Sequence, residues 1–200
     1  MTFNRRKALS ALATVPLFSG CAVTYARFRE TPGPDWGYLV ASTAIELPSA
    51  LRITSCAFGG TMVGTKDNFM LSTNIAMAST QKLDISTPEI SAVIGVQPLP
   101  PGRYLLNHIG YYANELQSWR IFDGVAPTFL EMPSRTVLYL GSYKATRANS
   151  IAVTDEQQRD LRIALSKSPN LAILPMQNQV PGQRPRSVAS NSPASSLRSA

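Results

Sequence analysis

The stretch TVLYLG, residues 136–141, is the clearest strand signal in this chain. Valine, leucine and tyrosine suit a half-buried strand, and the glycine that follows them marks a turn. Similar short stretches, bounded by Pro, Gly or Asp-Gly, lie at residues 38–41, 51–54, 68–72, 90–96, 103–109, 118–122 and 128–132. This spacing predicts a mainly β protein, an antiparallel β-sandwich of about seven or eight short strands.

One α-helix is predicted near residues 155–168, after these strands. Thr154 and Gln157 have the spacing of a capping box, and Pro169 ends the helical pattern. A narrow apolar face that includes Leu161 is expected to cover a sheet edge. Residues 171–174 are apolar and predict one more strand.

Composition favours one folded domain with little net charge. The chain has 200 residues, 44% of them apolar and 16% charged, and we assign residues 36–180 to a single sandwich domain. The formal net charge is +7, yet residues 22–180 hold 13 basic and 12 acidic side chains, so the excess lies at the two ends. A nucleic-acid partner is not predicted, because it would need basic residues concentrated on a folded surface.

Residues 1–20 have the layout of a secretory signal peptide. A positive start with Arg5, Arg6 and Lys7 precedes an apolar stretch at residues 8–18, which is too short to cross a bilayer as a helix. Small residues then precede Cys21, as at a signal-peptide cleavage site. The chain is therefore expected to be exported.

The segment LFSGC, residues 17–21, resembles the lipobox of bacterial lipoproteins. The resemblance implies cleavage after Ser19 and Gly20, with Cys21 becoming the first residue of the mature chain and carrying the lipid. Stable membrane attachment then comes from the burial of the acyl chains. Since Ala22 rather than aspartate follows the cysteine, the resemblance favours the outer membrane over the inner, with the domain facing the periplasm. Paired arginines in the signal leave Sec and twin-arginine export both open.

Two polar segments flank the predicted domain. Residues 21–35 end in TPGP and are expected to form a lipid-anchored tether. Residues 181–200 hold six Ser, three Pro and three Arg, and this basic segment is predicted to be disordered. Lipidation of Cys21 would leave Cys56 as a lone thiol, so the core must be stable without an intramolecular disulfide.

Two further segments carry a resemblance of their own. PGRY at residues 101–104 and RTVLYLG at residues 135–141 resemble the strands of prealbumin-like and carboxypeptidase-regulatory-like β-sandwiches. The chain is also similar to uncharacterised bacterial envelope lipoproteins that carry such domains. This resemblance supports the sandwich fold and transfers no catalytic residue.

Catalytic chemistry has few candidates in this sequence. Cys56 and His108 could form a nucleophilic pair if the fold brought them together. Strict alternation instead places His108 on the face of Tyr104 and Leu106, as a packed histidine, and leaves Cys56 as a half-buried structural thiol unless a bulge intervenes. A single histidine and two cysteines also exclude a multi-histidine or four-cysteine metal site, and neither a metal nor a cofactor is predicted.

Aromatic residues offer a possible binding face. Tyr111 and Tyr112 point to opposite sides of any strand that contains both, so one of them is expected at the surface. The full set from which a stacking platform could be drawn is Trp36, Tyr38, Tyr104, Tyr111, Tyr112, Trp119, Tyr139 and Tyr143.

Together these patterns predict a lipid-anchored cell-envelope protein with a non-catalytic interaction or scaffold domain. Its expected partners are the membrane, through the N-terminal lipid, and an envelope protein. Two alternatives remain open at this level: an envelope hydrolase that uses Cys56 and His108, and a glycan- or peptidoglycan-binding module that uses exposed tyrosines.

Overall fold

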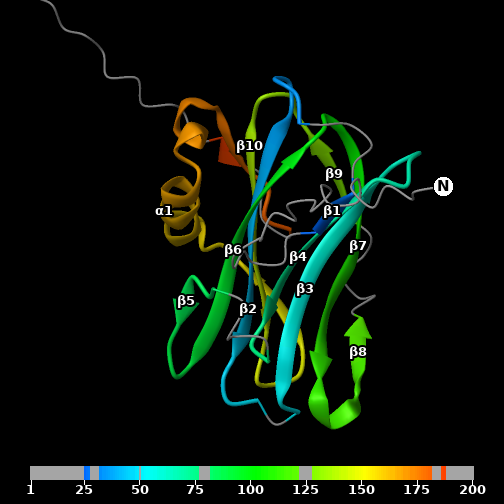
Figure 1. Cartoon of the computed structure of the whole chain (residues 1–200), viewed down its shortest axis with the longest axis vertical. Helices are drawn as coiled ribbons and strands as arrows, with labels where there is room; N and C mark the ends of the chain where they lie inside the picture. The colour runs from blue at the N-terminus through cyan, green and yellow to red at the C-terminus, as the bar shows by residue number, and fades with distance from the viewer. Residues whose placement is uncertain are drawn as a thin grey trace, which may run out of the picture.

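Two β-sheets packed face to face, with a helical layer on one of them, form the part of the chain that this computed structural model describes (Figure 1). The predicted signal peptide at residues 1–20, its cleavage site and Cys21 lie outside the described residues. The structure describes residues 25–27, 32–49, 51–76, 82–121, 128–181 and 186–187, with backbone alone at 25–27, 128 and 186–187.

The six-stranded sheet, called sheet A, has the order β1-β4-β3-β7-β8, and β9 pairs with β7. All of its pairings are antiparallel. Its strands are β1 (Tyr25–Arg27), β3 (Ile53–Met62), β4 (Asn68–Asn74), β7 (Gly102–Ala113), β8 (Ser118–Ile121) and β9 (Thr128–Met132).

The seven-stranded sheet, called sheet B, has the order β13-β12-β10-β2-β6-β5, and β11 pairs with β10. Strand β10 runs parallel to both β2 and β12, whereas the other pairings are antiparallel. Its strands are β2 (Gly37–Glu46), β5 (Ile85–Ser86), β6 (Ile90–Leu99), β10 (Val137–Ala145), β11 (Ile151–Thr154), β12 (Met176–Asn178) and β13 (Arg186–Ser187).

The predicted fold class, a mostly antiparallel β-sandwich with one α-helix, is confirmed. The strands are more numerous and longer than predicted, and β7 alone has 12 residues. The strand predicted at residues 38–41 is shorter than β2 because the polar residues Ser42 and Thr43 interrupt the apolar pattern. Both side chains are nevertheless completely buried. Thr43 reaches across to sheet A, where its Oγ1 lies 2.8 Å from Oγ1 of Thr73. This hydrogen bond offsets the free-energy cost of burying the hydroxyl groups of Thr43 and Thr73.

The main core lies between the two sheets and is rich in aromatic rings. Phe58 stacks on Tyr143 with ring centroids 4.1 Å apart, and Phe69 meets Phe58 edge to face at 5.7 Å. Such offset and T-shaped pairs add to the free energy of burial itself. Leucines and a methionine from β2, β4, β7, β9 and β10 complete this cluster. The core therefore covers the inner faces of β3, β4, β7 and β9 in sheet A.

A second core lies between the outer face of sheet B and a helical layer, made of α1 (Gln157–Lys167) and the 3₁₀ helix η2 (Pro169–Ile173). Asp160 of α1 is completely buried there, and its Oδ2 accepts hydrogen bonds from Ser42 Oγ at 2.7 Å and Tyr139 OH at 2.9 Å. Burial, followed by the charge of Asp160, raises the pKa of Tyr139. At the end of the helix, Lys167 Nζ donates to the Ile94 carbonyl at 2.6 Å. The helix is thus fixed to sheet B along its length.

Two local predictions in this region are wrong. Thr154 ends β11 and forms no capping box; the backbone N–H of Gln157 donates instead to Asp155 Oδ1 at 3.1 Å. The apolar residues 171–174 lie mostly in η2 rather than in a strand. Leu171 fills the space beneath the helical layer, which explains why this segment is apolar without being a strand.

Short strands also occur inside the two flanking segments. Strand β1 lies within the predicted tether at residues 21–35 and pairs antiparallel with β4, placing Tyr25 opposite Met70. Strand β13 lies within the tail predicted to be disordered and pairs with β12. Neither strand was expected, because segments of two or three residues carry no periodic signal of their own.

Candidate binding face on sheet A

Within the ranges that the structure describes, no helix covers the outer face of sheet A. The helix α1 and η2 lie on the opposite side, against sheet B, and neither reaches sheet A (Figure 1). Strand alternation and register bring Ala57, Gly110 and Ile121 into one row across this face. Gly59 and His108 form the next row. Side chains of β3, β4, β7 and β8 therefore share one surface.

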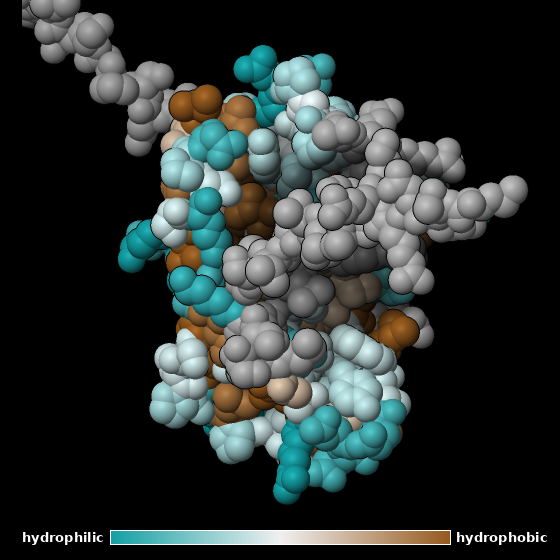
Figure 2. Space-filling view, in the orientation of Figure 1, coloured by the Kyte–Doolittle hydropathy of each residue, from teal (hydrophilic) through white to brown (hydrophobic). Residues whose placement is uncertain are grey.

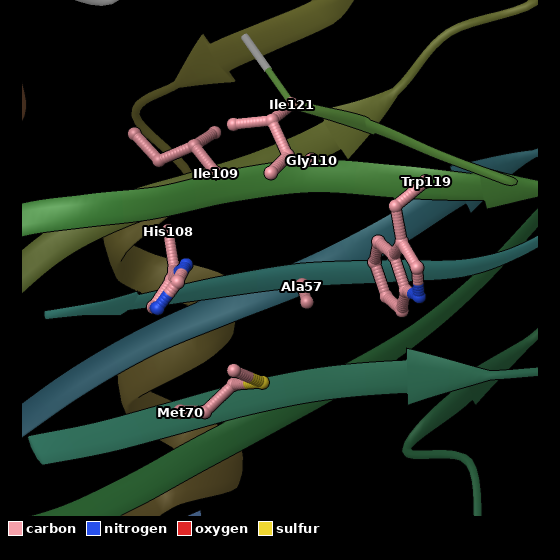
Figure 3. A pocket seen from close by; sticks show the side chains of 7 residues that line it. All are labelled: Ala57, Met70, His108, Ile109, Gly110, Trp119 and Ile121. Carbon is pink, nitrogen blue, oxygen red and sulfur yellow. The ribbon is translucent and has the colours of Figure 1, made fainter. Parts of the chain in front are cut away.

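A groove of about 260 Å³ lies on this face. Figure 3 shows His108 and Trp119 on either side of Ala57, with Met70 on the neighbouring strand β4. Apart from the His108 ring and the Trp119 indole N–H, the lining side chains carry no hydrogen-bonding group. The residues that line the groove are Ala57, Met70, His108, Ile109, Gly110, Trp119 and Ile121.

The floor of the groove consists of small residues because strands approach one another closely there. A Cβ on Gly110 would lie 2.4 Å from the Arg120 carbonyl oxygen of β8, and a Cβ on Gly59 would lie 2.5 Å from the Phe69 carbonyl oxygen of β4. Real side chains do not tolerate such contacts. Glycine at both positions keeps the sheet paired, and Gly110 also leaves its part of the groove floor free of a side chain.

The rim of the groove is apolar and exposed. Trp119 and Ile121 are 48% and 59% exposed, and both lie on β8, an edge strand of four residues. Tyr112 supports the indole from the side, edge to face, at a centroid distance of 6.0 Å. Hydrophobic surface appears near the upper end of β8 in the space-filling view, above polar residues at the lower tip (Figure 2). Large exposed apolar side chains that share one face often mark a contact surface.

His108 faces outward because of a β-bulge. The register of β7 against β3 shifts between Leu106, opposite Gly60, and His108, opposite Gly59, which leaves Asn107 as the extra residue. Leu106 and Ile109 both face the core, whereas His108 is exposed. The prediction of a packed histidine on the face of Tyr104 is wrong, since strict alternation breaks at this bulge.

Cys56 faces the opposite side of the same sheet. A register shift at Thr54 resets the alternation, and the thiol is completely buried, with Sγ 3.5 Å from the Tyr143 carbonyl oxygen. Desolvation raises the pKa of Cys56 to about 12. The structure therefore does not bring Cys56 and His108 together. Such a thiol also lacks the electropositive, accessible surroundings of a reactive cysteine.

The two neighbouring tyrosines point to opposite faces, as alternation requires. Tyr111 lies in the core with 2% exposure, and its hydroxyl donates to the Asn149 carbonyl at 3.0 Å. Tyr112 shares the outer face with Trp119 and is half-buried. Of the two residues proposed from the sequence for a binding face, only Tyr112 borders the groove side of sheet A.

A second apolar group stands on the same face, on β9. Phe129 is 51% exposed, and the Arg103 guanidinium lies 3.9 Å from the centre of its ring. Arg103 also pairs with Glu131, with 3.4 Å between Nε and Oε1. Phe129, Trp119 and Ile121 therefore all project from the β8–β9 side of sheet A.

The described residues contain no group of three His, Cys, Asp or Glu side chains that could hold a metal ion. Within the same ranges, no helix is long and apolar enough to span a membrane. Neither a family model, a curated protein nor a solved structure matches this chain.

Most of the groove was not visible in the sequence. Trp119 stood out only as one aromatic residue among eight. The available signal is the alternation of Trp119, Arg120 and Ile121 on a short strand, which puts two large apolar side chains on one side. Met70, Ala57 and the glycines join them through pairing between distant strands, and no local pattern reveals that pairing.

Proposed function

We propose that this chain is a lipid-anchored, non-catalytic module of the cell envelope that acts through the outer face of sheet A. The observation that carries the proposal is the apolar character of that face, where exposed Trp119 and Ile121 border a groove with almost no hydrogen-bonding side chains. An apolar surface of this kind suits contact with another apolar surface better than it suits chemistry on a polar substrate.

The anchor is proposed on Cys21 and the lipobox-like residues before it. Strand β1 begins at Tyr25, so only four residues of chain lead from the lipidated cysteine to a hydrogen-bonded strand. Four extended residues span at most about 14 Å. The anchor would hold the sandwich close to the bilayer and raise its effective concentration for anything at that surface. Ala22 favours the periplasmic side of the outer membrane as the site.

The alternative hydrolase draws no support from the described geometry. Cys56 is buried in the core beneath sheet A, whereas His108 lies on the outer face. A nucleophile and its base need to lie within hydrogen-bond reach of one another. A sugar-binding groove is also disfavoured, since sugar hydroxyls would find few partners besides His108 and the Trp119 indole.

The test is intact mass spectrometry of the protein from isolated membranes, beside a Cys21→Ser variant. The expected wild-type species begins at Cys21 and carries the mass of the added acyl groups. The variant is expected to lack that mass and to leave the membrane fraction. A wild-type chain that retains Met1 and has no added mass would overturn the anchor.

A further inference from the structure

The strand that follows the proposed anchor in the sequence and the strand that carries Trp119 and Ile121 form opposite edges of one sheet. Strand β1 forms one edge of sheet A, and β8 forms the other, four strand spacings away. At about 4.8 Å per spacing, the two edges are roughly 19 Å apart. The strand pairings thus place the start of β1, the described strand nearest to Cys21 in the sequence, on one side of the outer face and the apolar rim on the other.

The groove lies between these edges. Tyr25 of β1 is the register partner of Met70, and Met70 lines the groove. A bilayer reached by a lipid within about 14 Å of Tyr25 is therefore also close to the groove. Because β1 is hydrogen-bonded to β4, the chain between the lipid and the sheet is too short for the sandwich to move far from the surface.

We propose that the outer face of sheet A lies against the bilayer that holds the Cys21 lipid, with Trp119, Ile121 and Phe129 entering its interfacial region. The inference rests on the proposed function and names the partner of that face.

The chemistry of the face fits a lipid surface. Tryptophan is enriched at membrane interfaces, where its ring is apolar and its N–H stays near the head groups. Arg103, over the ring of Phe129 on the same face, is positioned to meet anionic head groups. An apolar groove without charged lining residues also suits acyl chains. A protein partner would need complementary polar contacts at a rim, and the groove offers almost none.

The test uses tryptophan fluorescence, since the chain has two tryptophans and they differ in exposure. Trp36 is 7% exposed, and Trp119 is 48% exposed. The lipidated protein is reconstituted in phosphatidylethanolamine–phosphatidylglycerol vesicles, with and without lipids brominated in their acyl chains. We expect bromolipid to quench a large part of the wild-type emission and to leave the emission of a Trp119→Phe variant nearly unchanged.

A matched control moves the probe to the other side of the molecule. Ile173 is 86% exposed at the end of η2, on the sheet B side. In a Trp119→Phe background, Ile173→Trp provides a tryptophan at a more exposed position that the proposal places away from the bilayer. Its emission is expected to be insensitive to bromolipid. Equal quenching of both probes, or of neither, would overturn the orientation proposed here.

A second arm separates this proposal from the anchor. The Cys21→Ser protein, which cannot be lipidated, is titrated with the same vesicles without bromine. Its apparent affinity is expected to fall about tenfold with Ile121→Ser, the loss expected when one large apolar side chain is no longer buried. The affinity should not change with Ile173→Ser.

The two arms fail in different ways. If mass spectrometry finds the lipid but bromolipid does not quench Trp119, the bilayer contact is wrong while the anchor stands. The face would then be left for a protein partner. If no lipid is found, the anchor is wrong, and the vesicle titration still decides whether the face binds lipid.

Discussion

Sheet B buries its outer face beneath α1 and η2, whereas no helix in the described part of the chain covers the outer face of sheet A. The covered face holds a polar network, in which Asp160 joins the helix to Ser42 and Tyr139 of the sheet. The uncovered face holds glycines, an alanine and exposed apolar side chains. The two outer faces of the sandwich thus differ: polar groups are buried on sheet B, and apolar groups are exposed on sheet A.

The contrast has a physical reason on the sheet B side. A buried carboxylate is costly unless hydrogen bonds replace its water, and here the replacement donors come from two strands and from Arg159. Such a network fixes one position for the helix. On sheet A, Trp119 and Ile121 remain largely exposed among the described residues, which is why we propose an external partner for them.

The largest expected effect follows from removing Asp160. Asp160→Ala leaves Ser42 Oγ and Tyr139 OH without their buried acceptor, and the free energy of unfolding should fall by about 3 kcal/mol. Urea unfolding followed by far-ultraviolet circular dichroism measures this change. The substitution also removes one of the two carboxylates with which Arg159 pairs, and only Glu156 remains.

The matched control for this change is Arg162→Ala on the same helix. Arg162 is exposed, so its loss should change the free energy of unfolding by less than about 0.5 kcal/mol. Equal stability of Asp160→Ala and Arg162→Ala would mean that the helical layer is not fixed to sheet B in this way, and the comparison of the two faces would fail.

A smaller effect is expected from filling the floor of the groove. In Gly110→Ala, the new Cβ would lie 2.4 Å from the Arg120 carbonyl oxygen, so β8 must shift away from β7. We expect a loss of about 1–3 kcal/mol in the free energy of unfolding. Hydrogen exchange should also show faster exchange of the amides that join β7 and β8.

Gly33→Ala is the control, since its Cβ would come no closer than 3.7 Å to the Trp36 ring. That contact is an ordinary van der Waals distance, so little change in stability is expected. If Gly110→Ala is as stable as Gly33→Ala, the strands do not approach as closely as described.

The buried thiol gives a pH-dependent prediction. Burial raises the pKa of Cys56 to about 12, from an ordinary value near 9, so the folded state holds this proton more tightly than the unfolded state does. Its contribution to stability is fully present below about pH 8.5 and is lost as the pH rises from there toward 12. Between pH 9 and 10 the free energy of unfolding should fall by about 1 kcal/mol from this group.

Cys56→Ala tests the assignment, because it removes this part of the pH dependence while other groups still titrate. Thiol labelling in a Cys21→Ser background should be slow in the native protein at pH 8 and fast after unfolding. Rapid labelling of the native protein would show that Cys56 is accessible, and the hydrolase alternative would have to be considered again.

The sequence was sufficient to predict the fold class but not to predict which side chains share a face of each sheet. Strands such as β10 show as apolar stretches because their residues are buried whatever their partners. The parallel pairing of β10 with β2 depends on contacts about a hundred residues apart, which no local pattern encodes. The helix was predicted at its place, yet the N–H of its first residue, Gln157, donates to Asp155 and the expected capping box at Thr154 does not form.

The candidate site was less predictable, for a reason that particular residues make clear. Alternation placed His108 in the core, and one extra residue, Asn107, turned it outward. A bulge at Thr54 likewise turned Cys56 inward. Each bulge reverses every side chain beyond it, so two inserted residues were enough to misplace both candidates for catalysis. The contrast between Tyr111 and Tyr112 followed from alternation alone and needed no such knowledge.

The smallest expected effect concerns Ile121, and it tests whether the face is open. Because this side chain is 59% exposed, Ile121→Ala should change the free energy of unfolding of the Cys21→Ser protein by less than about 0.5 kcal/mol. A loss of 2 kcal/mol or more, the size typical of a buried isoleucine, would mean that another part of the chain covers Ile121. Sheet A would then be covered as sheet B is, and the side chain could not reach a bilayer. A near-zero change in stability, together with weaker vesicle binding of Ile121→Ser, would instead separate the role of this residue from the stability of the fold.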